Sequence, residues 1–247
     1  MKTIVFDFDG VVCESTDECM VSSWNAWENW QSRDAFRKNL DDFSADEQQA
    51  FRKVRPRVRG AGEYYILRRA FDENIPIENQ QAYNDLVLQW AEHLDDFKAV
   101  FFNMRNRLRK ENLDDWIDLH PVYENVIDVM KTLNDENRLF VATLKDAESV
   151  RLILNKQGVH IADDHLLDQS QIKTKLQALD HFRKQINCEK QGLIFIDDNV
   201  THLLEPHAAG YPVYLTTWGS EMDEYLQIAK DNRIPLLDDV RQLMRII

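Results

Sequence analysis

The spacing between the first two strand patterns constrains the fold of this chain more than any other feature. Residues 3–6 form a short β-branched and aromatic run that ends in Asp-Phe-Asp-Gly at residues 7–10. Such a run is typical of a buried strand with polar residues at its carboxyl end. The next run of this kind begins only at Leu139, whereas a βαβ crossover needs about 30 residues. The sequence therefore predicts a domain inserted between the first and second strands of a sheet.

The remainder of the chain alternates strand patterns with helix patterns. Apolar runs like the first recur at residues 139–143, 193–196 and 212–215. Amphipathic repeats accompany them at residues 122–133, 147–157 and 175–186. Strands that alternate with helices of this length predict an α/β fold with a parallel, doubly wound sheet. We assign residues 1–14 and 118–247 to this core.

The inserted segment, residues 15–117, has the pattern of an all-helical domain. Ser15 and Ser44 are each followed three residues later by glutamate, the capping-box arrangement that begins many helices. Amphipathic stretches follow at residues 63–71, 80–94 and 98–108. The chain has only 7 glycines, and this scarcity of permissive backbone positions favours helices over a sandwich or barrel.

Charge and composition exclude several classes of partner. The chain has 30 Lys+Arg against 43 Asp+Glu, a net charge of −13, which argues against a general nucleic-acid binder. No apolar run approaches the roughly 18 residues that cross a bilayer, so we expect no membrane partner. The three widely spaced cysteines and the absence of an apolar leader before the first strand predict free thiols in a cytoplasmic protein. No pattern indicates an oligomeric state.

Polar residues follow the predicted strands at the edge where open α/β sheets bind ligands. Asp7 and Asp9 point the same way along an extended chain, and paired carboxylates suit a hard cation. Gly10 allows a sharp turn beside them. Thr143 ends the second strand, and Lys175 begins a later helix.

Two further acids complete this set. Asp197 and Asp198 follow the strand pattern at 193–196 and would add carboxylate oxygens at the same edge. Taken alone, these acids also fit a helix N-terminus. Taken together with the first pair, they predict an oxygen-rich cation site.

This set of residues resembles the motifs of the haloacid dehalogenase-like hydrolases, a superfamily of aspartate-nucleophile phosphatases. Four elements carry the resemblance in the right order: Asp7-Phe8-Asp9-Gly10-Val11, Thr143, Lys175 followed by Ala178-Leu179, and Ile196-Asp197-Asp198-Asn199. The resemblance implies a Rossmann-like core with a helical cap inserted after the first strand.

The resemblance also implies catalytic roles. Asp7 would attack phosphorus and form an aspartyl-phosphate. Asp9 would protonate the leaving alcohol and then deprotonate the hydrolytic water. Thr143 and Lys175 would bind the phosphoryl oxygens. Asp9 favours phosphoryl chemistry, because dehalogenating members of the superfamily lack this second acid.

The same resemblance implies a Mg²⁺ site. Asp7, the backbone carbonyl of Asp9, Asp197 and Asp198 would hold the ion. The side chains of Asp7, Asp9, Asp197 and Asp198 carry four negative charges when ionised, and a phosphate monoester brings nearly two more. Magnesium and a lysine are therefore needed before Asp7 can approach the substrate.

Two positions depart from the family pattern. Leu144 and Lys145 follow Thr143, where many members have asparagine, so Lys145 and Lys173 remain alternatives to Lys175 as the essential lysine. Lys145 could itself bind phosphate. His202 stands where many members have an acid, and we interpret it as a partly buried helix residue and not as a metal ligand.

The helical insert contains a cluster of cations in an otherwise acidic chain. Residues 52–59 include Arg52, Lys53, Arg55, Arg57 and Arg59. For most of them a solvated helix face is the favoured interpretation. For Arg59, which precedes the glycine-rich residues 60–62, a solvated helix face and contact with an anionic substrate both remain open.

Three tryptophans recur at every third residue of the insert, at Trp24, Trp27 and Trp30. This spacing favours packing in the interior of the helical domain over a platform for stacking a substrate.

We therefore expect a Mg²⁺-dependent phosphatase that acts on a small phosphorylated metabolite. Two alternatives share its core residues: a sugar phosphomutase, and a catalytically silent homologue that serves as a binding or regulatory subunit. The core motifs recognise the phosphoryl group alone and do not identify the rest of the substrate.

Overall fold

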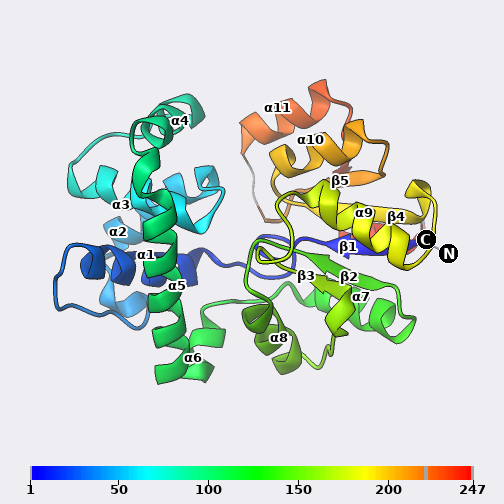
Figure 1. Ribbon diagram of the computed structural model, residues 1–247, viewed down its shortest axis with the longest axis horizontal. Coiled ribbons are helices and arrows are strands. Elements are labelled where there is room, and N and C mark those ends of the chain that lie inside the picture. The colour runs from blue at the N-terminus through cyan, green and yellow to red at the C-terminus, as the bar shows by residue number, and fades with distance from the viewer. Residues whose placement is uncertain (1, 220–221, 246–247) are drawn as a thin grey trace. The chain divides into compact units, whose positions relative to one another are not determined.

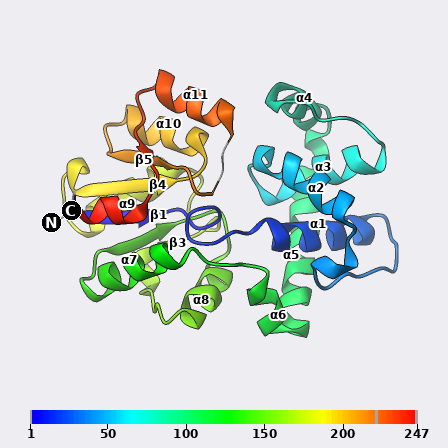
Figure 2. The same ribbon diagram turned by 180° about the vertical axis from the view of Figure 1, so that it is seen from behind.

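The computed structural model describes residues 2–219 and 222–245. Contacts divide the chain into two compact units (Figures 1 and 2). One contains Met1–Glu14 and Pro121–Ile247, and the other contains Ser15–His120. We call the first the sheet unit and the second the helical unit. The helical module expected from the sequence at residues 15–117 has the same start, and its expected end falls just before His120.

The sheet unit is built on six strands in the order β3-β2-β1-β4-β5-β6. They are β1 (Thr3–Phe6), β2 (Leu139–Ala142), β3 (Leu166–Leu167), β4 (Leu193–Asp197), β5 (Val213–Thr216) and β6 (Leu236–Leu237). Every neighbouring pair is parallel. All residues of β1, β2 and β4 are buried, as expected for apolar strands covered on both faces. The predicted α/β class is confirmed.

Helices cover both faces of this sheet (Figures 1 and 2). The longer ones are α7 (Glu124–Asp135), α8 (Ala147–Lys156), α9 (Lys175–Gln185), α10 (Val200–Ala208) and α11 (Asp223–Asp231), and the 3₁₀ turns are η5 (Asp163–His165), η6 (Lys190–Gly192) and η7 (Val240–Arg245). Alternate strand residues such as Val5, Phe140 and Phe195 share one apolar core with side chains of α9, α10 and α11. Because β1 and β4 are parallel neighbours in this sheet, their carboxyl ends lie side by side.

The helical unit has no strand within residues 15–120, all of which the structure describes. Its helices are α1 (Thr16–Trp30), α2 (Ala45–Val54), α3 (Tyr64–Asp72), α4 (Gln80–Gln89), α5 (Leu94–Glu111) and α6 (Leu113–Asp118), with the 3₁₀ turns η1 (Leu40–Asp42), η2 (Arg55–Arg57), η3 (Ala61–Glu63) and η4 (Ala91–His93). The expectation of an all-helical insert is confirmed. Among the described residues of the whole chain, no helix is both long enough and apolar enough to span a membrane.

Only one of the two expected capping boxes forms. Ser44 accepts a hydrogen bond from the backbone of Glu47, and the Glu47 side chain accepts one from the backbone of Ser44. Ser15 makes no side-chain cap hydrogen bond. The prediction at Ser15 is wrong because Glu18 is fully buried and accepts two hydrogen bonds from Arg105 of α5, at 2.8 and 2.7 Å.

The chain leaves the sheet unit and returns to it at one place. Glu14 N donates to Pro121 O at 2.9 Å, and Tyr123 N donates to Val12 O at 3.0 Å. Cys13 and Val122 form an antiparallel bridge between these two passages. The helical unit is therefore inserted through two adjacent, hydrogen-bonded segments of chain.

Candidate active site

Three carboxylates meet where β1 and β4 end. Asp7 directly follows β1, and its backbone N donates to Ile196 O of β4 at 2.9 Å. Asp197 ends β4, and Asp198 follows it. Carboxylate oxygens of Asp7, Asp197 and Asp198 all lie within 4.8 Å of one another. The parallel pairing of two sequence-distant strands thus creates one oxygen-rich cluster at the sheet edge.

Lys175 lies against this cluster. The side chain of Thr174 caps α9 and so makes Lys175 its first residue. The Lys175 ammonium donates to Asp7 Oδ1 at 2.5 Å and to Ala142 O at 2.7 Å. It also lies 3.5 Å from Asp197 Oδ2. One buried cation therefore contacts two of the three carboxylates.

The pKa values of the buried groups follow from these contacts. Burial, together with the nearby charge of Asp197, raises the pKa of Asp7 to about 6, and the opposing effects of Lys175 and His202 only partly offset this rise. Burial alone would depress the pKa of Lys175, but Asp7 and Asp197 outweigh that effect and hold it above its usual value. At neutral pH the cluster therefore presents an Asp7 carboxylate beside a protonated lysine.

Asp197 is held from two further sides. Asn199 N donates to its Oδ1 at 2.8 Å, and His202 Nδ1 of α10 lies 3.1 Å from its Oδ2. Burial would raise the pKa of Asp197, but His202 and Lys175 outweigh it and the net shift is downward. His202 is half-buried in its helix, as the sequence suggested. Its contact with Asp197 was not predicted.

Asp9 has a different lysine partner. Lys145 is almost entirely buried, and its ammonium lies 3.0 Å from Asp9 Oδ1. Lys145 N donates to Thr143 Oγ1 at 3.1 Å, which leaves the hydroxyl proton of the buried Thr143 available to another acceptor. The structure thus brings Asp9, Lys145 and Thr143 together at the end of β2, beside the cluster around Asp7.

Glycine is required at two points of this edge. Gly10 has a φ of +81°, and a Cβ there would lie 2.2 Å from Asp198 Oδ2. A Cβ on Gly219, in the loop after β5, would lie 1.8 Å from Gly10 O. Trp218 Nε1 in the same loop donates to Val11 O at 3.0 Å. Trp218 and Gly219 were not predicted from the sequence, although a glycine just after a strand of this sheet was a usable signal.

The remaining expected residues lie elsewhere. Lys173 is exposed, and its backbone N donates to the Gln177 side chain at 2.9 Å. Arg59 belongs to the helical unit, where its guanidinium donates to Asn84 Oδ1 at 3.3 Å. The edge of the sheet therefore gathers every expected residue of the core except Lys173.

Comparison with known proteins identifies the family of this chain. A sequence model of the haloacid dehalogenase-like hydrolases matches residues 1–210. No curated protein sequence matches the chain significantly.

Solved structures with low sequence identity share the fold over nearly their whole length. A protein described as a predicted phosphatase from Clostridium acetobutylicum has a TM-score of 0.63 at 15% identity, with 99% of this chain and 97% of that one covered. A protein described as a predicted phosphoglycolate phosphatase from Haemophilus somnus 129pt has a TM-score of 0.61 at 19% identity, with 100% and 97% covered. A haloacid dehalogenase superfamily hydrolase, subfamily IA, from Geobacter sulfurreducens PCA has a TM-score of 0.57 at 14% identity, with 100% and 96% covered. The resemblance drawn from the motifs is confirmed, and the protein belongs to the haloacid dehalogenase-like hydrolases.

Proposed function

We propose that this protein is a Mg²⁺-dependent phosphatase that hydrolyses a small phosphate monoester through an aspartyl-phosphate on Asp7. The observation that carries the proposal is the Asp7 carboxylate, which contacts Lys175 and lies within 4.8 Å of carboxylate oxygens of Asp197 and Asp198. The phosphatase descriptions of the similar structures agree with it.

The donor set suits a small hard cation. Three carboxylates offer oxygen atoms within 4.8 Å, and Mg²⁺ takes oxygen ligands, commonly one or two carboxylates with substrate phosphate and water. We therefore assign the ion to Asp7, Asp197 and Asp198, with the backbone carbonyl of Asp9 as a further ligand. When bound, Mg²⁺ neutralises charge on both the carboxylates and the phosphoryl group.

Asp7 is suited to nucleophilic attack. With its pKa at about 6, it is ionised at neutral pH and more basic than an exposed aspartate. Its oxygen forms a bond to phosphorus while the bond from phosphorus to the ester oxygen breaks. The Lys175 ammonium donates a hydrogen bond to this carboxylate and so stabilises it. The same ammonium donates to the phosphoryl oxygens of the incoming substrate.

Asp9 handles the protons of both steps. Its carboxyl group donates a proton to the leaving ester oxygen, and the resulting carboxylate then takes a proton from the water that attacks the aspartyl-phosphate. Lys145, 3.0 Å away, stabilises the carboxylate form that acts in the second step. The Thr143 hydroxyl donates to a phosphoryl oxygen, because its own oxygen already accepts from Lys145 N. Free phosphate and the original Asp7 carboxylate are the products.

A phosphatase screen with Asp7→Asn tests the proposal. Purified protein with Mg²⁺ is incubated with phosphoglycolate, sugar phosphates, nucleotides and phosphoamino acids, and released phosphate is measured. At least one ester should be hydrolysed, and Asp7→Asn should lower kcat by at least about a hundredfold because the amide is a poor nucleophile. An inactive panel, an unaffected Asp7→Asn variant, or isomerisation of a hexose phosphate without phosphate release would contradict the proposal.

Two lysine variants provide a matched comparison. Lys175→Met should lower kcat by about a hundredfold or more, since it removes the only cation that contacts Asp7 among the described residues. Lys173→Met removes an exposed ammonium two positions earlier in the chain and should leave kcat near that of the wild type. Equal losses in both variants would show that Lys175 has no special role.

A further inference from the structure

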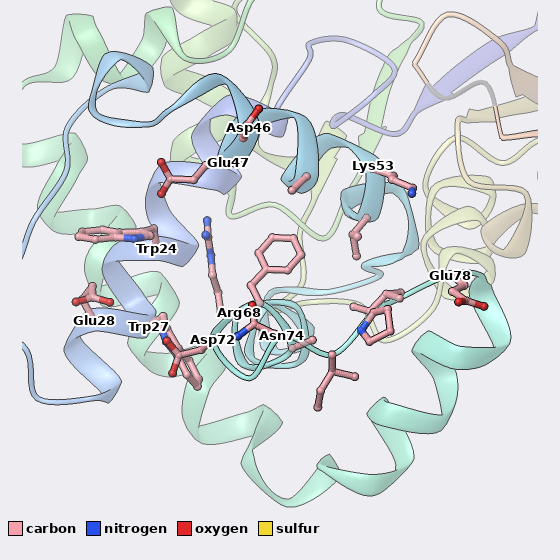
Figure 3. A pocket seen from close by; sticks show the side chains of 17 residues that line it. Trp24, Trp27, Glu28, Asp46, Glu47, Lys53, Arg68, Asp72, Asn74 and Glu78 are labelled. Carbon is pink, nitrogen blue, oxygen red and sulfur yellow. The ribbon is translucent and has the colours of Figure 1, made fainter.

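A cavity of about 830 Å³ lies wholly within the helical unit. Its walls come from α1, α2, α3 and the loop of residues 74–78 (Figure 3). Aromatic rings of Trp24, Trp27 and Phe71 line it, and Arg68 is its most buried charged residue. Its volume lies in the range of about 300–1,000 Å³ that is usual for small-molecule sites. The phosphatase chemistry proposed above makes no use of this cavity.

Arg68 has an unused hydrogen-bonding edge. The residue is only 7% exposed. Its Nε donates to Ser23 Oγ at 3.0 Å, and its Nη2 donates to Ser23 Oγ at 2.9 Å and to Met20 O at 2.5 Å. Among the residues that the structure describes, Nη1 has no hydrogen-bond acceptor and the guanidinium has no carboxylate in contact. Figure 3 shows this side chain extending from α3 into the space between the lining residues.

Three acids of the cavity wall contact other arginines and form no ion pair with Arg68. Glu28 pairs with Arg33 at 3.1 Å, and Glu47 pairs with Arg37 at 3.0 Å. Asp72 lies 3.8 Å from Arg33. Burial lowers the pKa of Arg68 to about 9, so the guanidinium still carries its charge at neutral pH. A buried cation without a contacting anion is costly to the fold, and a bound anion would offset that cost.

The surroundings specify what kind of anion fits. The free edge of one guanidinium matches one carboxylate. Exposed acids at the mouth, Asp46 and Glu78, disfavour a strongly charged ion such as a phosphate dianion. The indole rings and Phe71 offer apolar contact area to the remainder of a ligand. Trp27 Nε1 adds a second buried donor that lacks an acceptor among the described residues.

We propose that the helical unit binds a small organic monocarboxylate in this cavity. The carboxylate accepts hydrogen bonds from Arg68 Nη1, and its apolar or aromatic body lies against Trp24, Trp27 and Phe71. All of the contacts lie within Ser15–His120, so the site is separate from the carboxylate cluster of the sheet unit.

Calorimetric titration of the full-length protein tests this proposal. The probes are phenylacetate, 3-phenylpropionate and hexanoate, each compared with its neutral amide, and sodium phosphate and chloride serve as inorganic anions. We expect at least one carboxylate to bind with an affinity at least tenfold above that of its amide. If none of the carboxylates binds, or if phosphate or chloride binds through Arg68 while the carboxylates do not, the proposal is wrong.

Three variants locate the binding. Arg68→Met keeps the length of the side chain but removes its charge, and it should weaken carboxylate binding at least tenfold. Arg107→Met removes an exposed arginine of α5 that pairs with Glu111 outside the cavity, and it should bind like the wild type. Unchanged affinity in Arg68→Met would refute the site.

Ala50→Trp decides the question even if Arg68→Met does not fold. Ala50 is exposed on α2 and lines the cavity, so an indole there fills the space while Arg68 stays in place. Carboxylate binding should fall at least tenfold in this variant. Binding that is unaffected by the filled cavity would place the ligand elsewhere and overturn the proposal.

Discussion

At the scale of single residues, each aspartate of the first motif is matched with its own lysine. Asp7 pairs with Lys175, and Asp9 pairs with Lys145. From the sequence, the two lysines are alternatives for one role, because strand and helix patterns locate a residue along the chain without showing which carboxylate its side chain reaches. The structure gives the two lysines separate partners.

Gly219→Ala tests the close approach of two loops at this sheet edge. An added Cβ would lie 1.8 Å from Gly10 O, so the backbone beside Asp9 must move. We expect a loss of about 1–3 kcal/mol in the free energy of unfolding together with reduced phosphatase activity. Urea denaturation and steady-state kinetics measure both.

Gly192→Ala is the control for this substitution. Its Cβ would meet nothing closer than Cys188 Cβ at 3.5 Å, an ordinary contact. It should therefore unfold at the same urea concentration as the wild type. Equal stability of the Gly219→Ala and Gly192→Ala proteins would show that the loops can separate without cost.

At the scale of elements, the same local pattern gave two different helix starts. Ser44 and Glu47 form a reciprocal cap because both lie at the surface. The glutamate that follows Ser15 is instead buried against Arg105, a residue of another helix. A capping pattern predicts local geometry only where its glutamate stays at the surface. The sequence does not show that the partner of Glu18 is an arginine on α5.

Ser44→Ala should destabilise the helical unit by about 1 kcal/mol, the usual cost of losing an N-cap side chain. The substitution leaves the Glu47 backbone N–H at the start of α2 without its side-chain acceptor. Chemical denaturation followed by circular dichroism measures the effect. Gln49→Ala, at an exposed position of the same helix, should change stability by less than about 0.5 kcal/mol, and a similar loss in both variants would contradict the capping interpretation.

At the scale of the whole molecule, the sequence predicted the parallel core and the all-helical insert. Apolar runs of four or five residues predicted β1, β2, β4 and β5 nearly to the residue. The two-residue strands β3 and β6 are too short to show any periodicity. Residues 80–94 were expected to form one helical stretch, but α4 ends at Gln89 and α5 begins at Leu94. Local hydrophobicity does not reveal such a turn, because buried Trp90 continues the apolar pattern through it.

Removal of the helical unit tests whether the sheet unit is an independent domain. Because Glu14 N and Pro121 O are hydrogen-bonded, a short Gly-Ser link can replace residues 15–120 without stretching the chain. We expect the shortened protein to unfold cooperatively in urea. Residues 121–247 alone should not fold, since β1 pairs with both β2 and β4. An unfolded shortened protein, or a folded fragment 121–247, would contradict this division.

The central position of β1 has a consequence for biosynthesis. β1 is translated before its two partners, β2 at Leu139–Ala142 and β4 at Leu193–Asp197. Its backbone N–H and C=O groups therefore stay unpaired until those strands have been synthesised. The helical unit emerges completely in that interval, and domains that emerge early can fold early. Translation that stops soon after residue 120 would therefore release a folded helical unit with an exposed apolar strand at its amino end, which is a template for aggregation.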